Sequence, residues 1–237
     1  MIDNIEKFSN AFKNAVEYRN KDYRTEFLYL AFEMLKKKVG VPKSIKLKLF
    51  NEKQDLTYNG YFRVETDGER VLFNRNYIQT DKSTKESVDL VTEYQEMDND
   101  WLYPIKTLDC LCHELKHCFD YYNNSLLVID KEKTITLNKE LGKDIYMINP
   151  SEIAAFQFSY GCLKEILNEV LEYCNQNWDI YNILIYEMEK NMLPWVEDIA
   201  KRHTERVALA KKRLEKAKIN YNDYYYSISK TEYVINQ

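Results

Sequence analysis

Apolar side chains recur every three or four residues in two stretches near the start of the chain, one between positions 5 and 16 and the other between 27 and 35. This spacing places them on one face of a helix, so the pattern predicts two amphipathic helices within residues 3–38. Gly40 and Pro42 follow the second stretch, and both residue types commonly end a helix. The apolar positions are Ile5, Phe8, Phe12, Val16, Phe27, Leu28, Ala31, Phe32 and Leu35.

The pattern then changes to alternation. Between positions 45 and 49, apolar residues alternate with lysines, as they do in a half-buried strand. Two short apolar runs at 61–64 and 70–73 flank Asp67-Gly68, a dipeptide that favours the positive φ angles of a tight hairpin turn. We therefore predict a small antiparallel sheet in this part of the chain.

Longer apolar segments follow. A short helix is expected at 87–94, and the apolar residues of 104–122 predict a longer helix that begins at a proline. Residues 126–148 are expected to form strands or a loop. A further helix is predicted over 151–175, with Ser151 as its N-cap, because a serine hydroxyl can accept a hydrogen bond from a free backbone N–H there.

The last third of the chain has a heptad-like seam on a long charged helix. Its positions alternate by four and three residues, which is the spacing of a coiled-coil contact. We expect this seam to pack against the N-terminal helical pair at 3–38, or else to form a homodimer or bind a partner helix. The seam comprises Val196, Ala200, His203, Val207, Ala210, Leu214 and Ala217.

Composition narrows the class of protein. A hydrophobic fraction of 45% and 20 tyrosines in 237 residues indicate a packed core. The net charge of −4 gives no general attraction to nucleic acid or to an anionic membrane, so neither is expected as a partner. No signal-peptide pattern and no apolar run of membrane-spanning length is visible. The five cysteines are odd in number and three of them lie within nine positions, which favours free thiols and a cytoplasmic protein.

The pentapeptide His-Glu-Leu-Lys-His at 113–117 is the sharpest chemical signal in the chain. Residues i and i+4 of a helix lie on the same side one turn apart, so His113 and His117 can hold one tetrahedral ion. Glu114 projects beside the pair and is the candidate general base for a zinc-activated water. The alternative interpretation is a solvated helical face, but the flanking apolar residues predict a buried helix in which paired histidines need partners.

A catalytic zinc ion needs a third protein ligand and an open fourth position. Glu152 is the best candidate, because it opens the helix predicted at 151–175 and the alanines that follow it allow close approach to the motif helix. The alternative role of Glu152 is that of a first-turn acid stabilised by the helix dipole. The other downstream candidates are Asp120, Glu140, Asp144, Glu165 and His203.

Several neighbouring residues have competing interpretations. Asp120 lies three residues after His117, and we expect it either to orient His117 through a hydrogen bond or to be solvated, since one straight helix cannot easily surround an ion. Cys110 and Cys112 could form a Cys₂His₂ set with the two histidines. Four ligands on one helix do not enclose a tetrahedron, however, so buried reduced thiols are expected. His203 is expected to be a seam residue rather than a ligand.

The order His-Glu-x-x-His followed by Asn-Pro-x-Glu-x-x-Ala resembles the gluzincin-type metallopeptidases, and most closely the short phage and mobile-element proteins of the ImmA/IrrE-like group. The resemblance covers residues 45–175 and implies a zinc ion bound by His113, His117 and Glu152, with Glu114 as the general base. It also implies an α+β fold in which a zincin-like core, with a small antiparallel sheet and a metal-binding helix, carries added N- and C-terminal helices. The expected segments are a helical segment at 1–42, the catalytic core at 43–175, and a long helix with a Tyr-rich tail at 176–237, together forming one compact unit.

These observations predict an intracellular zinc metallopeptidase that hydrolyses a peptide bond in a specific protein. Glu114 is expected to take the proton of the attacking water and pass it to the leaving amine. Tyr146 is one candidate for stabilising the oxyanion, together with other tyrosines near the motifs. An extended substrate is expected to pair with the strand at 70–78 as an edge strand. The alternative function is a non-catalytic interaction protein that keeps a metallopeptidase fold and acts through its C-terminal helix.

Overall fold

The computed structural model describes residues 2–18, 21–50, 60–65, 68–74, 101–123, 137 and 139–220. The helix expected at 87–94 lies outside these residues, as do the 126–136 part of the expected strand or loop region and the tail at 221–237. The helical elements are α1 (Ile5–Glu17), α2 (Lys21–Val39), α5 (Leu102–Tyr122), the 3₁₀ segment η2 (Lys143–Ile148), α7 (Pro150–Asn175), α8 (Trp178–Glu187), the π-helical turn η3 (Met188–Met192) and α9 (Leu193–Lys216). The strands are β1 (Lys46–Phe50), β2 (Gly60–Glu65) and β3 (Gly68–Asn74).

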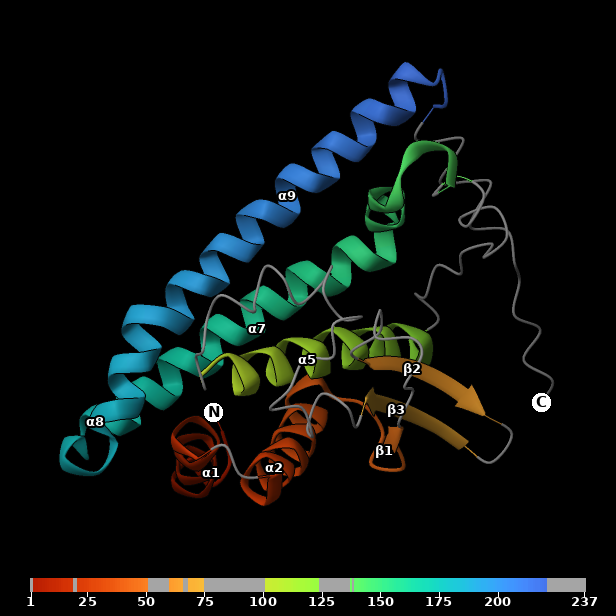
Figure 1. Ribbon diagram of the computed structural model, residues 1–237. Coiled ribbons are helices and arrows are strands. Elements are labelled where there is room, and N and C mark those ends of the chain that lie inside the picture. Colours follow the sequence, from red (N-terminus) through yellow and green to blue (C-terminus); the bar gives the residue numbers. More distant parts are fainter. Residues whose placement is uncertain are drawn as a thin grey trace.

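Two long helices, α5 and α7, lie side by side at the centre of the molecule (Figure 1). Helices α1 and α2 pack together and against α5, whereas α9 returns along α7 after the turn formed by α8 and η3. The small sheet lies beside α5. The central pair is therefore covered by helices over most of its length, with the sheet on one flank.

The two N-terminal helices form as the spacing of their apolar residues predicted. The rings of Phe8, Phe12 and Phe27 pack against one another where α1 meets α2, with Phe12 and Phe27 centroids 5.1 Å apart. Gly40 has a φ of 82° directly after α2, a conformation that glycine adopts without steric cost, so it ends the helix as expected.

One continuous hydrophobic core joins α1, α2, α5, α7, α8 and the start of α9. Its members include Phe12, Leu35, Leu111, Leu163 and Tyr181, which are at most 2% exposed. Because these residues come from both ends of the chain and from the central helices, the described parts of the three expected segments pack as one unit.

The predicted fold class, an α+β zincin-like core with a small antiparallel sheet, is wrong. The described residues are predominantly helical, and the three short strands form a mixed sheet in the order β1-β3-β2. The hairpin itself is confirmed, since β2 and β3 pair antiparallel with Arg63 opposite Arg70. Strand β1, however, pairs parallel with β3. The physical reason is that the buried faces of the helices pack on one another, so the core forms between helices and the sheet stays peripheral.

The long C-terminal helix is confirmed, but its predicted packing partner is wrong. The contacts of α9 are mainly with α7, η3 and η2 rather than with the N-terminal pair. Seam residues Val196, His203, Ala210 and Leu214 are buried, whereas Ala217 is exposed. The spacing thus predicted a buried stripe without showing which surface would cover it.

No helix within the described ranges is long and apolar enough to cross a membrane.

Candidate metal centre

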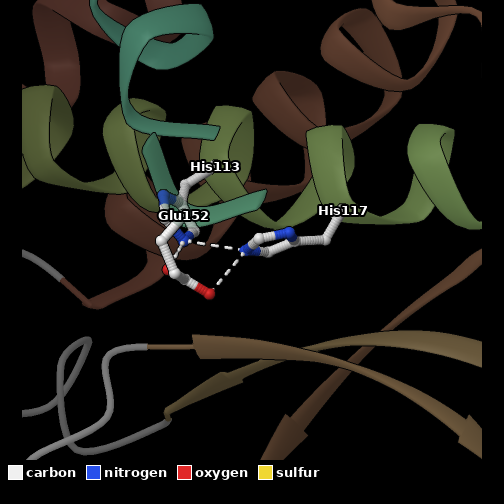
Figure 2. A group of neighbouring side chains, drawn as sticks. All are labelled: His113, His117 and Glu152. Carbon is white, nitrogen blue, oxygen red and sulfur yellow. Dashed lines mark hydrogen bonds and ion pairs between the residues drawn. The ribbon is translucent and has the colours of Figure 1, made fainter. Parts of the chain in front are cut away.

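The two motif histidines and Glu152 come together where α5 passes the N-terminal end of α7. His113 and His117 project from the same side of α5 one turn apart, and Glu152 reaches them from the first turn of α7 (Figure 2). The three side chains point toward one another, and in this view α5 lies above them and strands of the sheet lie below them. The structure therefore brings together the two sequence motifs, which are 35 residues apart between His117 and Glu152.

The spacing of the ligand atoms suits a small tetrahedral ion. The two Nε2 atoms of the histidines are 3.1 Å apart, and the Glu152 oxygens lie 3.2 Å from His113 Nε2 and 3.3 Å from His117 Nε2. Zinc bonds to nitrogen of 2.0–2.1 Å at tetrahedral angles require ligand atoms about 3.3–3.4 Å apart. One nitrogen or oxygen atom from each residue lies within 4.8 Å of the others, and only small shifts separate this arrangement from a zinc site.

Unsatisfied buried atoms at the centre also favour a bound cation. The side chains are 12% exposed for each histidine and 7% for Glu152. Glu152 Oε2 is buried and, although within ion-pair distance of His113, lacks a well-oriented hydrogen bond. The other ring nitrogen of His113, Nδ1, is also buried without a hydrogen-bond partner in the described part of the chain, but the nitrogen that meets Glu152 and His117 is Nε2. Two imidazoles and one carboxylate form a common catalytic zinc set, so the residues present fit this metal.

His113 and Glu152 each shift the pKa of the other. Burial alone would lower the pKa of His113, but Glu152 at ion-pair distance and the negative charge of Glu114 outweigh it and raise that pKa to about 9. Burial opposes ionisation of Glu152 too, yet the two histidines at ion-pair distance lower its pKa below the usual carboxyl range. A proton on His113 thus neutralises the carboxylate when no ion is bound.

The N-terminus of α7 positions Glu152. Asn149 is the N-cap, and its side-chain oxygen accepts a hydrogen bond of 3.1 Å from the backbone N–H of Ser151, while Pro150 occupies the first helical position. The prediction of Ser151 as the cap is therefore wrong by two residues, because asparagine caps equally well and proline suits the first turn. The cap and the proline thus fix the first turn of α7, from which the side chain of Glu152 projects.

The segment that leads into this cap is held by α9. A second hydrophobic cluster contains Ile145 and Ile148 of η2 together with Ala210 and Leu214 of α9. Arg213 adds a hydrogen bond of 3.3 Å to the carbonyl oxygen of Leu141. The C-terminal helix consequently braces the approach to Glu152.

Glu114 is buried beside the ligands. It is 8% exposed, and its charge contributes to the raised pKa of His113. Glu114 therefore carries a buried carboxylate whose charge acts on one of the three grouped residues.

The other candidate ligands whose side chains the structure describes are not in the three-residue ligand group. Asp120 is buried and forms an ion pair with Lys116 one turn earlier, and it is not one of the three grouped ligands. Glu165 forms an exposed ion pair with Lys38. Tyr146 is 41% exposed on η2, and Glu140 is also exposed. The side chain of Asp144 lies outside the described residues.

The cysteines are free thiols, as the sequence predicted. None of the five forms a disulfide within the described residues, and four of them are buried. The rival Cys₂His₂ set does not form, because Cys110 and Cys112 are absent from the ligand group found among the described residues. Burial raises the pKa of the Cys110 thiol, which disfavours the thiolate that a metal requires.

His203 was a downstream candidate that we expected to be a seam residue rather than a ligand, and the structure places it one aromatic ring away from His113. The centroid of the His203 imidazole ring lies 4.3 Å from that of the Phe156 ring, at a tilted angle, and the Phe156 ring lies 4.4 Å from that of His113. The seam periodicity correctly placed His203 on the buried face of α9, but it could not show that this face meets α7 one turn beyond Glu152. The available signal was the scarcity of histidine, since the chain has only three.

Comparison with known proteins gives no relative: no family model, curated protein or solved structure matches the chain.

Proposed function

We propose that this protein is a zinc-dependent hydrolase acting on peptide bonds, with His113, His117 and Glu152 as the metal ligands. The observation that carries the proposal is the meeting of these ligand atoms at separations suited to one tetrahedral ion, beside a buried Glu114.

The residues present have distinct roles in such a reaction. Zinc, when bound, would polarise a carbonyl group and make a nearby water more acidic. Glu114 accepts the proton of the attacking water and donates it to the leaving amine, because a carboxylate in this position can act in both directions. Three protein ligands leave a coordination position open, which favours catalysis over a purely structural site.

The alternative, an interaction protein acting through the C-terminal seam, has less support. The central seam residues His203, Ala210 and Leu214 are covered by the protein's own η2 segment and α7. A stripe buried in this way is not available to a partner helix.

Zinc analysis and peptide cleavage test the proposal together. We expect the zinc-reconstituted protein to hold one ion per chain and to cleave members of a mixed peptide library, with the products detected by mass spectrometry. Glu114→Gln should retain the ion and the fold but lose at least about 100-fold in cleavage rate, the usual contribution of a general base. Glu165→Gln, an exposed carboxylate on α7, is the matched control and should cleave normally.

Two results would contradict the proposal. If the wild-type protein binds no zinc, the proposed metal centre is wrong. Cleavage by Glu114→Gln at the wild-type rate removes Glu114 from the reaction even if zinc is present.

A further inference from the structure

His203 is a buried polar residue with an unsatisfied nitrogen. Its side chain is 6% exposed, and its Nε2 atom has no hydrogen-bond partner among the described residues. Leaving such an atom buried and unpaired costs free energy, so it calls for a specific explanation. A residue that served only to fill the seam between α9 and α7 could be apolar at no such cost.

The surroundings connect His203 to the metal centre. Phe156 lies one helical turn after Glu152 on α7, and the centroid of its ring is 4.4 Å from that of His113 and 4.3 Å from that of His203. Tyr160, one turn further, packs edge-on against His203 with ring centroids 5.9 Å apart. Two of the three histidines therefore pack against one aromatic side chain, and the third, His117, packs against His113.

The imidazole of His203 is uncharged at neutral pH. Burial lowers its pKa to about 4, with further lowering by the charges of Arg206 on its own helix and of His113 on α5, against the opposing effect of Glu152. A neutral imidazole carries one N–H donor and one acceptor nitrogen, so it can bind an oxygen atom without bringing a second positive charge to the centre.

We propose that His203 is a substrate-contacting residue of the metal centre, whose Nε2–H donates a hydrogen bond to an oxygen of a molecule bound at His113, His117 and Glu152. This inference rests on the proposed metal-dependent function. His203 is not a fourth ligand, because the ligand group among the described residues contains only the other three. A donor aimed at such an oxygen would stabilise the negative charge that develops on it during hydrolysis. The long C-terminal helix would then supply part of the active site as well as bracing it.

The test uses acetohydroxamate as the probe, because its two oxygens bind a metal ion in place of a reacting group. The full-length protein is loaded with Co²⁺, and the visible absorption of the ion reports both metal binding and probe binding without any turnover. His203→Phe retains a ring to pack against Phe156 and Tyr160 but removes the N–H donor. Thr204→Ala alters an exposed residue on the same helix and is the matched control.

We expect His203→Phe to bind Co²⁺ as tightly as the wild type, within about threefold, but to bind acetohydroxamate about tenfold more weakly, the effect of losing one hydrogen bond. Thr204→Ala should match the wild type in both measurements. His203→Gln, which keeps an N–H donor, should recover part of the probe affinity if its fold is retained by thermal unfolding.

The outcomes separate the two proposals. If the wild type binds Co²⁺ but not acetohydroxamate, or if His203→Phe binds the probe as tightly as the wild type, the role of His203 is wrong and the metal centre stands. If the wild type binds neither Co²⁺ nor Zn²⁺, both proposals are wrong.

Discussion

His113 and Glu152 bind each other in the metal-free protein through the same side-chain groups that would bind an ion. The pKa of His113 is raised to about 9, so this imidazole is protonated at pH 7 and must lose its proton when a metal binds. In the absence of metal, protonated His113 therefore forms an ion pair with Glu152, and a metal ion must replace that proton to bind.

This competition predicts a pH dependence of metal affinity. We expect about one proton to be released per zinc ion bound at pH 7, and the apparent affinity to rise about tenfold per pH unit until it levels off near pH 9. Calorimetric titration in buffers of different ionisation enthalpy measures the released protons. In Glu152→Gln the pKa of His113 should fall, so proton release at pH 7 should largely disappear. Absence of proton release from the wild type would contradict the raised pKa.

The same shift affects the stability of the metal-free fold. The pKa of His113 rises from 6.5 to about 9 on folding, so the protonated imidazole contributes its full stabilisation below pH 6.5. That contribution is lost as the pH rises through 9, where the folded protein also gives up the proton. Bound metal should remove this alkaline loss, because it replaces the proton as the partner of Glu152.

The positions of individual site residues were predictable where the spacing along one helix determines which side chains lie together. The i, i+4 relation of His113 and His117 fixes their geometry on any helix, and Glu152 was identified from its position at a helix start. The proximity of His203 was not predictable, because it depends on how α9 crosses α7. Asp120, expected either to orient His117 or to be solvated, is buried and forms an ion pair with Lys116.

At the scale of elements, the first turn of α7 carries both a cap and a ligand. We predict that Asn149→Ala costs about 1 kcal/mol of stability through loss of the cap, and that it weakens zinc binding several-fold because Glu152 lies three residues beyond. Asn4→Ala is the control, since Asn4 caps α1 through the backbone N–H of Lys7, far from the metal centre. Chemical denaturation and chelator competition measure the two effects. Equal zinc affinity in both variants would show that the cap does not position Glu152.

The packing of helix α9 leads to a second prediction at the scale of elements. Leu214 is fully buried in the cluster with Ile145 and Ile148, so Leu214→Ala should destabilise the protein by about 2–5 kcal/mol. Leu209 on the same helix is 46% exposed, and Leu209→Ala should cost less than about 0.5 kcal/mol. Urea unfolding distinguishes them. Similar losses in both variants would mean that the seam is not a packed interface.

The elements themselves were more predictable than their pairing. Apolar periodicity located α1, α2, α5, α7 and α9, because one buried face produces the same spacing whichever surface covers it. Alternation located the strands, but a period of two does not encode strand direction, so the parallel pairing of β1 with β3 was missed. For the same reason β3 was expected at an edge, whereas it lies between β1 and β2.

At the scale of the whole molecule, the metal centre joins the two helices around which the others pack. His113 and His117 lie on α5 and Glu152 on α7, and the shared core connects this pair to α1, α2, α8 and the start of α9. The resemblance to a zincin was drawn from two short motifs, which specify the ligands but not the layers around them. The motifs thus predicted that His113, His117 and Glu152 come together, whereas the fold class inferred from them was wrong.

This arrangement predicts that metal binding stabilises the molecule as a whole rather than one segment. An ion present at about 1,000 times its dissociation constant adds about 4 kcal/mol to the free energy of unfolding. For a chain of this length each kcal/mol raises the melting temperature by about 2–4 °C, so zinc should raise it by about 8–16 °C. Because the ligands lie on both central helices, tryptophan fluorescence and far-UV circular dichroism should show the same shift in one transition. Glu152→Gln should lose most of the shift, whereas Glu165→Gln should keep it. A zinc-dependent shift seen by only one probe would show that the ion stabilises a local part of the chain, and that α5 and α7 do not unfold with the shared core.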